Sequence, residues 1–252
     1  MSTGLLLVTA AAAPSLGAAG GDRDVLWRIV HRCLDAGAPD YCASCPDPIE
    51  GSSCAVSNPL RRLQVWAKDS SYLAMRCSGD RCLCGGGFVH GLVLPLSPVT
   101  GVEDGRTLEP GMAGAWSFAW DAAVKKIKDR DAIVLLINPP GRRTQDQLHI
   151  HIVRLLPGAR RALLSRSQAR LALFLKKRNG KAPVPGAVFR RMPGLSRVWA
   201  AAAQAARSRR FKGYGIAVIR DSPGYLIVVL DGGCGRCPNP EEAFSINSCP
   251  AP

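Results

Sequence analysis

The sequence predicts an α+β fold in which helices flank an antiparallel sheet and disulfides staple the loops. Three observations support this prediction. Apolar residues recur at helical spacing in some segments and form short strand-like runs in others. Two pairs of those runs are joined by short turn signals, as in hairpins. Ten cysteines lie mainly in segments rich in proline and glycine.

Size and composition favour one domain with a sizeable core. The chain has 252 residues, and hydrophobic residues make up 47% of them. It shows no internal repeat, no domain-scale linker and no membrane-spanning run, so we expect a single domain over 22–252.

The net charge indicates an anionic partner. A formal charge of +14 attracts phosphates, acidic lipid headgroups or nucleic acid. Nucleic acid is disfavoured, because aromatics are only 6% of the chain and no recognition motif is present. A solvated basic surface with no single partner is the alternative.

The first 19 residues resemble a secretory signal peptide. An apolar run over 5–13 is too short to span a bilayer comfortably, and small residues at 17–19 form a candidate cleavage site. The positive segment that usually precedes such a run is missing, so an uncleaved anchor is the alternative. We therefore expect an exported protein that is periplasmic or associated with the cell membrane.

The cysteines fit that compartment. In an oxidising environment, loops of this composition are held by disulfides. Zinc is the alternative, because Cys42 with Cys45 and Cys234 with Cys237 have the spacing of zinc knuckles. We favour disulfides, since a signal-like N-terminus and a cytosolic zinc site point to different compartments. The ten cysteines are Cys33, Cys42, Cys45, Cys54, Cys77, Cys82, Cys84, Cys234, Cys237 and Cys249.

In the first half of the chain, apolar spacing of three to four residues predicts a helix over 22–34. A long loop over 35–59 follows. Short strands are then expected at 63–66 and 72–75. After a Cys- and Gly-rich loop over 77–87, the apolar run 88–96 predicts a buried strand ended by prolines.

In the second half, apolar positions at helical spacing predict a helix over 112–128. A strand over 132–138 and a turn at 139–143 lead into a strand over 146–155, so these two strands are expected to pair. The remaining predicted elements are a cationic amphipathic helix over 160–178, a loop over 179–194, a helix over 195–208, and a hairpin joining 214–219 to 225–230.

The strand over 146–155 carries the candidate chemistry. Side chains at alternate positions of a strand share a face. Gln147, His149 and His151 should therefore line one face, while the intervening Leu148, Ile150 and Ile152 pack into the core.

A neutral imidazole can attack phosphorus and form a covalent intermediate. His149, central on the polar face, is the candidate nucleophile, and His151 can donate to the phosphate or to the leaving oxygen. The Gln147 amide can bind a phosphate oxygen. The preceding turn offers guanidinium and main-chain donors to an anion. The remaining candidate binding residues are Asn138, Arg142, Arg143, Thr144 and Gln145.

Three alternatives compete with this interpretation. A His-x-His pair on a strand also suits a metal ion, but the sequence offers no third histidine nearby, and Asp146 lies on the opposite face. His90, on an apolar strand, suits a structural role more than a catalytic one. His31, on the polar side of the first helix, suits a solvated position.

The segment Ile137-Asn-Pro-Pro-Gly-Arg-Arg-Thr-Gln-Asp-Gln-Leu-His-Ile-His-Ile152 resembles the signature of bacterial CDP-diacylglycerol pyrophosphatases, a branch of the histidine-triad superfamily. Weaker similarities lie at 26–33, 90–95, 116–120 and 214–218, in the family's order. The resemblance implies a histidine-triad-like sheet. By motif position, the middle histidine of the triad is His149, the last is His151, and Gln147 replaces the first. His90 lies on a strand that resembles the one flanking the nucleotide.

The implied reaction is hydrolysis of the diphosphate in CDP-diacylglycerol to CMP and phosphatidate, through a nucleotidyl-histidine and without an obligatory metal or other cofactor. The basic helix over 160–178 could then rest on a membrane surface. Two other functions stay open: a soluble nucleotide pyrophosphatase or nucleotidyltransferase of the same superfamily, and a non-catalytic protein that binds anionic lipid.

Overall fold

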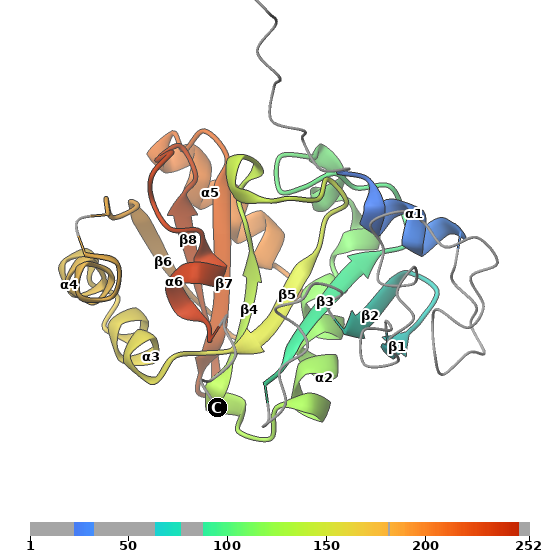
Figure 1. Cartoon of the computed structure of the whole chain (residues 1–252), viewed down its shortest axis with the longest axis horizontal. Coiled ribbons are helices and arrows are strands. Elements are labelled where there is room, and N and C mark those ends of the chain that lie inside the picture. The colour runs from blue at the N-terminus through green and yellow to red at the C-terminus, as the bar shows by residue number, and fades with distance from the viewer. Residues whose placement is uncertain (1–22, 33–63, 77–87, 181, 247–252) are drawn as a thin grey trace, which may run out of the picture.

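The computed structural model describes residues 23–32, 64–76, 88–180 and 182–246 of the chain. Within these residues it shows one eight-stranded antiparallel sheet and six α-helices, which confirms the predicted α+β class (Figure 1). Among the described helices, none has the length and apolar character needed to cross a bilayer. The signal-like segment over 1–19 lies outside the described residues.

The sheet follows the order β1-β2-β3-β5-β4-β7-β8-β6. Two of its pairs were predicted from turn signals: β4 with β5, and β7 with β8. The bounds of the strands are β1 Val65–Lys68, β2 Tyr72–Arg76, β3 His90–Pro95, β4 Ile133–Ile137, β5 Ile150–Arg154, β6 Ala187–Met192, β7 Tyr214–Asp221 and β8 Gly224–Asp231.

Two helices cover one face of the sheet, α2 (Ala115–Lys126) and α5 (Val198–Arg209) (Figure 1). Their small inward residues, mostly alanines, let the helices lie close to the strands. Trp116 and Trp199 fill the space between the two helices, with ring centroids 5.2 Å apart. This side forms the largest hydrophobic cluster of the described chain.

The other face of the sheet is covered at its two ends. Helix α1 (Val25–Arg32) packs on β2 and β3. Helices α3 (Pro157–Leu164), α4 (Gln168–Asn179) and α6 (Pro240–Phe244) pack on β4, β7 and β8. The middle of this face, on β3, β5 and the end of β4, lies between the two apolar clusters and carries the histidines.

The structure corrects several predicted elements. The expected loop over 179–194 contains β6, an edge strand that pairs with β8. Pro183, Pro185 and Gly186 hide this strand in the sequence. The expected helix over 160–178 is two helices, α3 and α4, because the chain turns at Arg166, which has a φ of 51°, and restarts at the Ser167 N-cap. The histidine strand begins at Ile150 rather than near 146.

Two of the ten cysteines, Cys234 and Cys237, lie within the described residues. Cys234 and Cys237 form a disulfide just before α6, which agrees with the preference for disulfides over zinc, although the sequence predicted no particular pairing. The other eight cysteines lie outside the described residues.

Candidate active site

The alternation predicted around β5 is present in the structure. Leu148, Ile150 and Ile152 are buried in the cluster beneath α2. His149 and His151 point to the opposite face, with ring centroids 4.8 Å apart. Both imidazoles are largely buried, with relative exposures of 8% and 6%. The histidine face is therefore an interior site rather than an open surface.

The ring of His149 is held in one tautomer by the main chain. Its Nδ1 lies 2.7 Å from the carbonyl oxygen of Gln147. Because a carbonyl only accepts hydrogen bonds, Nδ1 must carry the proton and Nε2 keeps its lone pair. Burial lowers the pKa of His149, which favours the neutral ring. This is the protonation state that a histidine nucleophile requires.

The side chain of Gln147 has a different environment from the one expected. Its Nε2 donates to the carbonyl oxygens of Pro95, at 2.9 Å, and Ser97, at 3.2 Å. The two amide hydrogens that were expected to meet a phosphate oxygen therefore join the segment before β5 to the end of β3.

His151 is paired with His90 from the neighbouring strand. The Nδ1 of His151 lies 3.1 Å from the Nε2 of His90, and both rings are buried. Strand β3 runs antiparallel to β5, which brings the two side chains together across the sheet. His90 was expected to be structural on residue pattern alone. Its place beside His151 makes it a member of the histidine cluster.

A carboxylate completes the cluster, and the sequence analysis missed it. Glu241, on α6, places its oxygens 3.5 Å from the Nε2 of His90 and 3.7 Å from the Nε2 of His151. Asn138, at the end of β4, donates to the Oε2 of Glu241 over 3.1 Å, and its Nδ2 lies 3.4 Å from the Nε2 of His151. The sequence Asn239-Pro240-Glu241-Glu242 is a helix-start signal with a capping box. That signal predicts α6 but not its contact with the histidines.

Two effects on the pKa values of the cluster oppose each other, namely burial and the attraction between Glu241 and the histidines. Burial lowers the pKa of His151 to about 3, against the opposite influence of the Glu241 carboxylate. Burial alone would raise the pKa of Glu241, but the histidines and the Asn138 amide outweigh it, so that this pKa lies below its ordinary value. Burial therefore favours neutral rings on His149 and His151, whereas attraction between the Glu241 carboxylate and a charged ring favours a proton on the histidines.

The turn before β5 is held by acidic side chains. Arg142 pairs with Glu242 at 3.2 Å, which joins the turn to α6. Arg143, with 7% of its side chain exposed, pairs with Glu103 at 2.6 Å and with Asp146 at 3.2 Å. Gln145 accepts a hydrogen bond from the main-chain N–H of Leu26, and Thr144 is exposed. The expected binding turn is thus near the cluster, with its charges already partnered.

A metal ion is the other chemistry that this cluster could support. One donor atom each from His90, His151 and Glu241 lies within 4.8 Å of the others. The sequence analysis disfavoured a metal because it found no third group near the His-x-His pair. The fold supplies His90 and Glu241 from distant segments, so that reason was wrong. In the structure His90 and His151 share a hydrogen bond, and Glu241 lies at ion-pair distance from both rings. His31 is exposed on α1.

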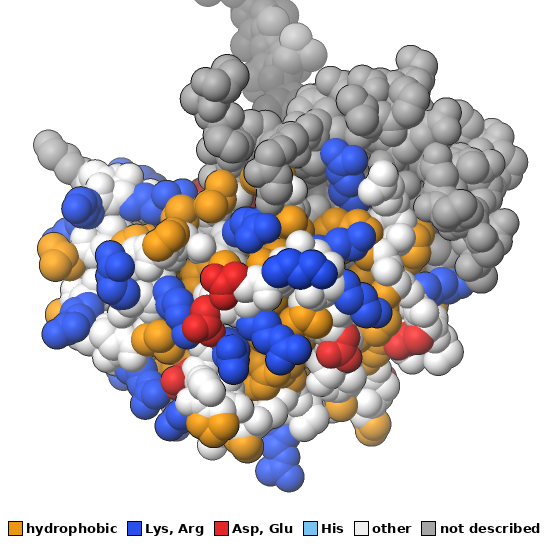
Figure 2. Space-filling view, turned by 90° about the horizontal axis from the view of Figure 1, so that it is seen from below, with side chains coloured by type: hydrophobic (Ala, Val, Ile, Leu, Met, Phe, Trp, Pro, Cys, Tyr) orange, Lys and Arg blue, Asp and Glu red, His pale blue; other side chains and the backbone are white. Residues whose placement is uncertain are grey.

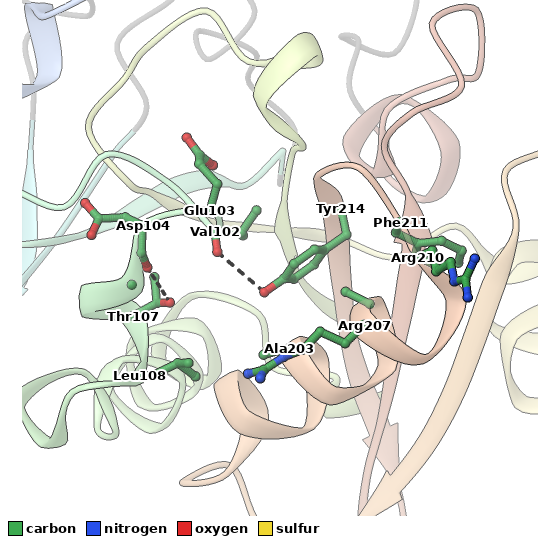
Figure 3. Close-up of a pocket in the computed structure, with 12 residues that line it drawn as sticks. Val102, Glu103, Asp104, Thr107, Leu108, Ala203, Arg207, Arg210, Phe211 and Tyr214 are labelled. Atoms are coloured by element: carbon green, nitrogen blue, oxygen red, sulfur yellow. Dashed lines mark hydrogen bonds between the residues drawn. The ribbon is translucent and has the colours of Figure 1, made fainter.

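A separate pocket of about 450 Å³ lies between the 3-10 helix η5 (Gly105–Leu108) and α5 (Figure 3). None of its lining residues is a histidine. The hydroxyl of Tyr214 donates to the carbonyl of Val102 over 3.4 Å across it. Glu103 connects this wall to Arg143. The pocket is therefore a neighbour of the histidine cluster and not part of it.

Fold and site together define an α+β protein with a buried histidine and carboxylate centre on one sheet. Comparison with known proteins then shows which family this chain resembles. A family model described as CDP-diacylglycerol pyrophosphatase matches residues 85–172, a segment that contains all three histidines of the cluster.

Curated relatives carry the same name. A CDP-diacylglycerol pyrophosphatase of Mycobacterium bovis (strain BCG / Pasteur 1173P2) is 29% identical over 154 residues, which is 59% of this chain and 50% of that protein. One from Yersinia pestis is 37% identical over 83 residues, which is 30% of this chain and 32% of that protein. The chain spans about half the length of the mycobacterial relatives it matches. These matches confirm the resemblance to the CDP-diacylglycerol pyrophosphatase family, whose members are hydrolases.

Proposed function

We propose that this chain hydrolyses the diphosphate of CDP-diacylglycerol to CMP and phosphatidate, with His149 as the nucleophile. The observation that carries the proposal is the hydrogen bond from His149 Nδ1 to the Gln147 carbonyl, because it leaves Nε2 unprotonated. The finer description of the fold as histidine-triad-like belongs to the same proposal, supported by the place of the histidines on paired strands.

In the proposed first step, His149 Nε2 attacks the phosphorus that bears the cytidine. The new N–P bond forms as the bond to the bridging oxygen breaks, and phosphatidate leaves after taking a proton from His151. In the second step, water attacks the nucleotidyl-histidine and returns a proton to His151. The products are CMP and free His149. No electron transfer occurs, and the atoms balance over the two steps.

The experiment that tests this function uses CDP-diacylglycerol labelled in the cytidine phosphate. We expect stoichiometric release of CMP and phosphatidate, and rapid acid-free quenching should trap label on His149, as mapped by mass spectrometry. A parallel reaction with CDP-choline separates the alternatives. Equal turnover of that soluble substrate would favour a general nucleotide pyrophosphatase. Lipid binding without any nucleotide release would favour a non-catalytic protein. Loss of activity with a chelator, restored by zinc, would favour a metalloenzyme.

The proposal includes a membrane surface as partner, on the basis of charge. Residues 147–220 contain no Asp or Glu and hold 17 of the 33 Lys and Arg residues. Figure 2 shows Lys and Arg side chains over one face of the molecule, with few acidic groups among them. On α4, Leu173 is 71% exposed and lies within one turn of Arg170, Lys176 and Lys177. An apolar side chain ringed by cations suits the interface of an anionic bilayer.

We expect Lys176→Glu/Lys177→Glu to weaken binding to phosphatidylglycerol-containing vesicles by roughly tenfold or more, at about 1 kcal/mol for each charge removed and more on reversal. Co-sedimentation at low and at moderate salt measures this. The matched control is Lys125→Glu/Lys128→Glu, two exposed lysines in the last turn of α2 and just after it, which makes the same change in net charge. Equal weakening by both variants would contradict a specific α4 surface, and so would stronger competition by RNA than by lipid.

Localisation follows the same proposal. We propose that the protein is exported and works in the periplasm or on the cell membrane, as residues 1–19 suggest. Cell fractionation of the full chain, and of a chain lacking 1–19, tests this.

A further inference from the structure

Glu241 is the one charged side chain of the cluster, and the fold holds it firmly. Its helix begins with Pro240, which packs on β7 at Gly215, where a Cβ would lie 2.6 Å from the proline ring. Asn239 and Glu242 form a capping box at the same helix start. Glu242, the next residue, points instead to Arg142. The two neighbouring carboxylates therefore have separate partners, one in the histidine cluster and one in the arginine turn.

The partners of Glu241 leave its charge uncompensated when the histidines are neutral. Among the described residues, its ion-pair partners are His90 and His151, and the amide of Asn138 donates to it. Its side chain is only 16% exposed. A largely buried carboxylate beside two neutral rings is costly, and an added proton on those rings relieves that cost. The Nε2 atoms of both rings face the carboxylate, so either can hold the added proton toward it.

We propose that Glu241 is a positioning residue that keeps a proton on the His90–His151 pair while a diphosphate is bound. This inference rests on the proposed function, because the proton is the one that His151 gives to the departing phosphate. The P–O bond to phosphatidate breaks as the proton moves from His151 Nε2 to that oxygen, and the water of the second step restores it. The Glu241 carboxylate itself exchanges no atom with the substrate.

Other groups near the His90–His151 pair also favour or disfavour a positive charge on the histidines. His149, just before β5, and burial both disfavour a positive charge on His151. Arg143, from the turn before β5, disfavours a positive charge on His149. Glu241, from α6, favours the charge on both, and the anionic diphosphate adds to its effect. Arg142 and Glu242 pair with each other at the edge of the site. In the described structure, the Gln147 carbonyl also opposes burial at His149, and Glu241 is the protein group that opposes burial at His151.

The test compares Glu241→Gln with Glu242→Gln in the full chain. Both changes remove one carboxylate from α6 and keep side-chain size, and the second leaves the histidine cluster intact. The value of kcat at saturating CDP-diacylglycerol is measured from pH 5 to pH 9, because kcat reports ionisations of the bound complex. We expect the alkaline limb to move to lower pH by one unit or more in Glu241→Gln. At pH 8 this corresponds to a loss of tenfold or more in kcat, with KM changed much less. Glu242→Gln should follow the wild-type profile.

Two further measurements distinguish a positioning role of Glu241 from a structural one. Thermal unfolding shows whether Glu241→Gln is folded, and Glu241→Asp, which restores the charge, should recover part of the alkaline activity. A loss of kcat by the same factor at every pH would overturn the proposal in favour of a structural role. If the wild type releases no CMP, the proposed function fails, and NMR titration of the His151 ring with inorganic pyrophosphate still decides this inference. An unchanged His151 titration in Glu241→Gln would then overturn it.

Discussion

His149→Ala is expected to reduce the release of CMP from CDP-diacylglycerol by roughly 10³-fold or more, because the variant has no atom to form the covalent intermediate. The neighbouring side chains remain, so binding of the substrate should change far less than kcat. Single-turnover assays with labelled substrate measure both effects. The same assays should detect no labelled protein after quenching.

His31→Ala is the matched control, because His31 is exposed on α1, away from the cluster. It should keep wild-type turnover and wild-type labelling. Thermal unfolding of both variants checks the fold, since His149 is buried and its loss leaves a small cavity. Retention of more than about a tenth of the activity in a folded His149→Ala variant would end the assignment of His149 as the nucleophile, since removal of a nucleophile costs several orders of magnitude.

His151→Gln is expected to lower kcat by about 10²-fold to 10⁴-fold, the usual contribution of a positioned general acid. Glutamine is close to histidine in size and keeps an N–H group, but it cannot give up a proton to the departing phosphate. The nucleophile is untouched in this variant. Label should therefore still accumulate on His149, more slowly than in the wild type, in a rapid-quench time course.

The position of the label distinguishes the two histidines. If the label moved to another residue in His151→Gln, or if that variant abolished labelling while His149→Ala retained it, the two roles would have to be exchanged. A full-speed first turnover in His151→Gln, with only the later release of CMP slowed, would place its proton in the hydrolytic step alone.

Local patterns in the sequence predicted the half of the site that lies on β5. The alternation of Gln147 to Ile152 required the histidines to share a face, because a strand sends successive side chains to opposite sides. The apolar partners of that alternation packed where expected. The pairing of β4 with β5 also followed from a local signal, the Pro- and Gly-rich turn between them.

The other half of the site depends on contacts between distant segments. His90 and His151 are 61 residues apart, and Asn138 and Glu241 are 103 residues apart. Nothing in the local pattern around Glu241 distinguishes it from Glu242, although one enters the histidine cluster and the other pairs with Arg142. The direction of each side chain depends on how α6 packs against β7, which periodicity does not encode.

Other differences also have local physical causes. The amide of Gln147 was free in the sequence interpretation, but two main-chain carbonyls at the end of β3 capture it. The split between α3 and α4 falls at Arg166, a residue type that rarely adopts a positive φ, so composition gives no warning. Strand β6 alternates weakly and lies at the sheet edge, where its residues stay partly exposed.

The close approach of Pro240 to Gly215 has an evolutionary consequence. The segment that the family model matches ends at 172, so it contains His149 and His151, the proposed nucleophile and proton donor, but neither Gly215 nor Glu241. A homologue with a bulkier residue at the β7 position would have to carry its C-terminal helix farther out. It could share this chemistry and still work best in a different range of acidity.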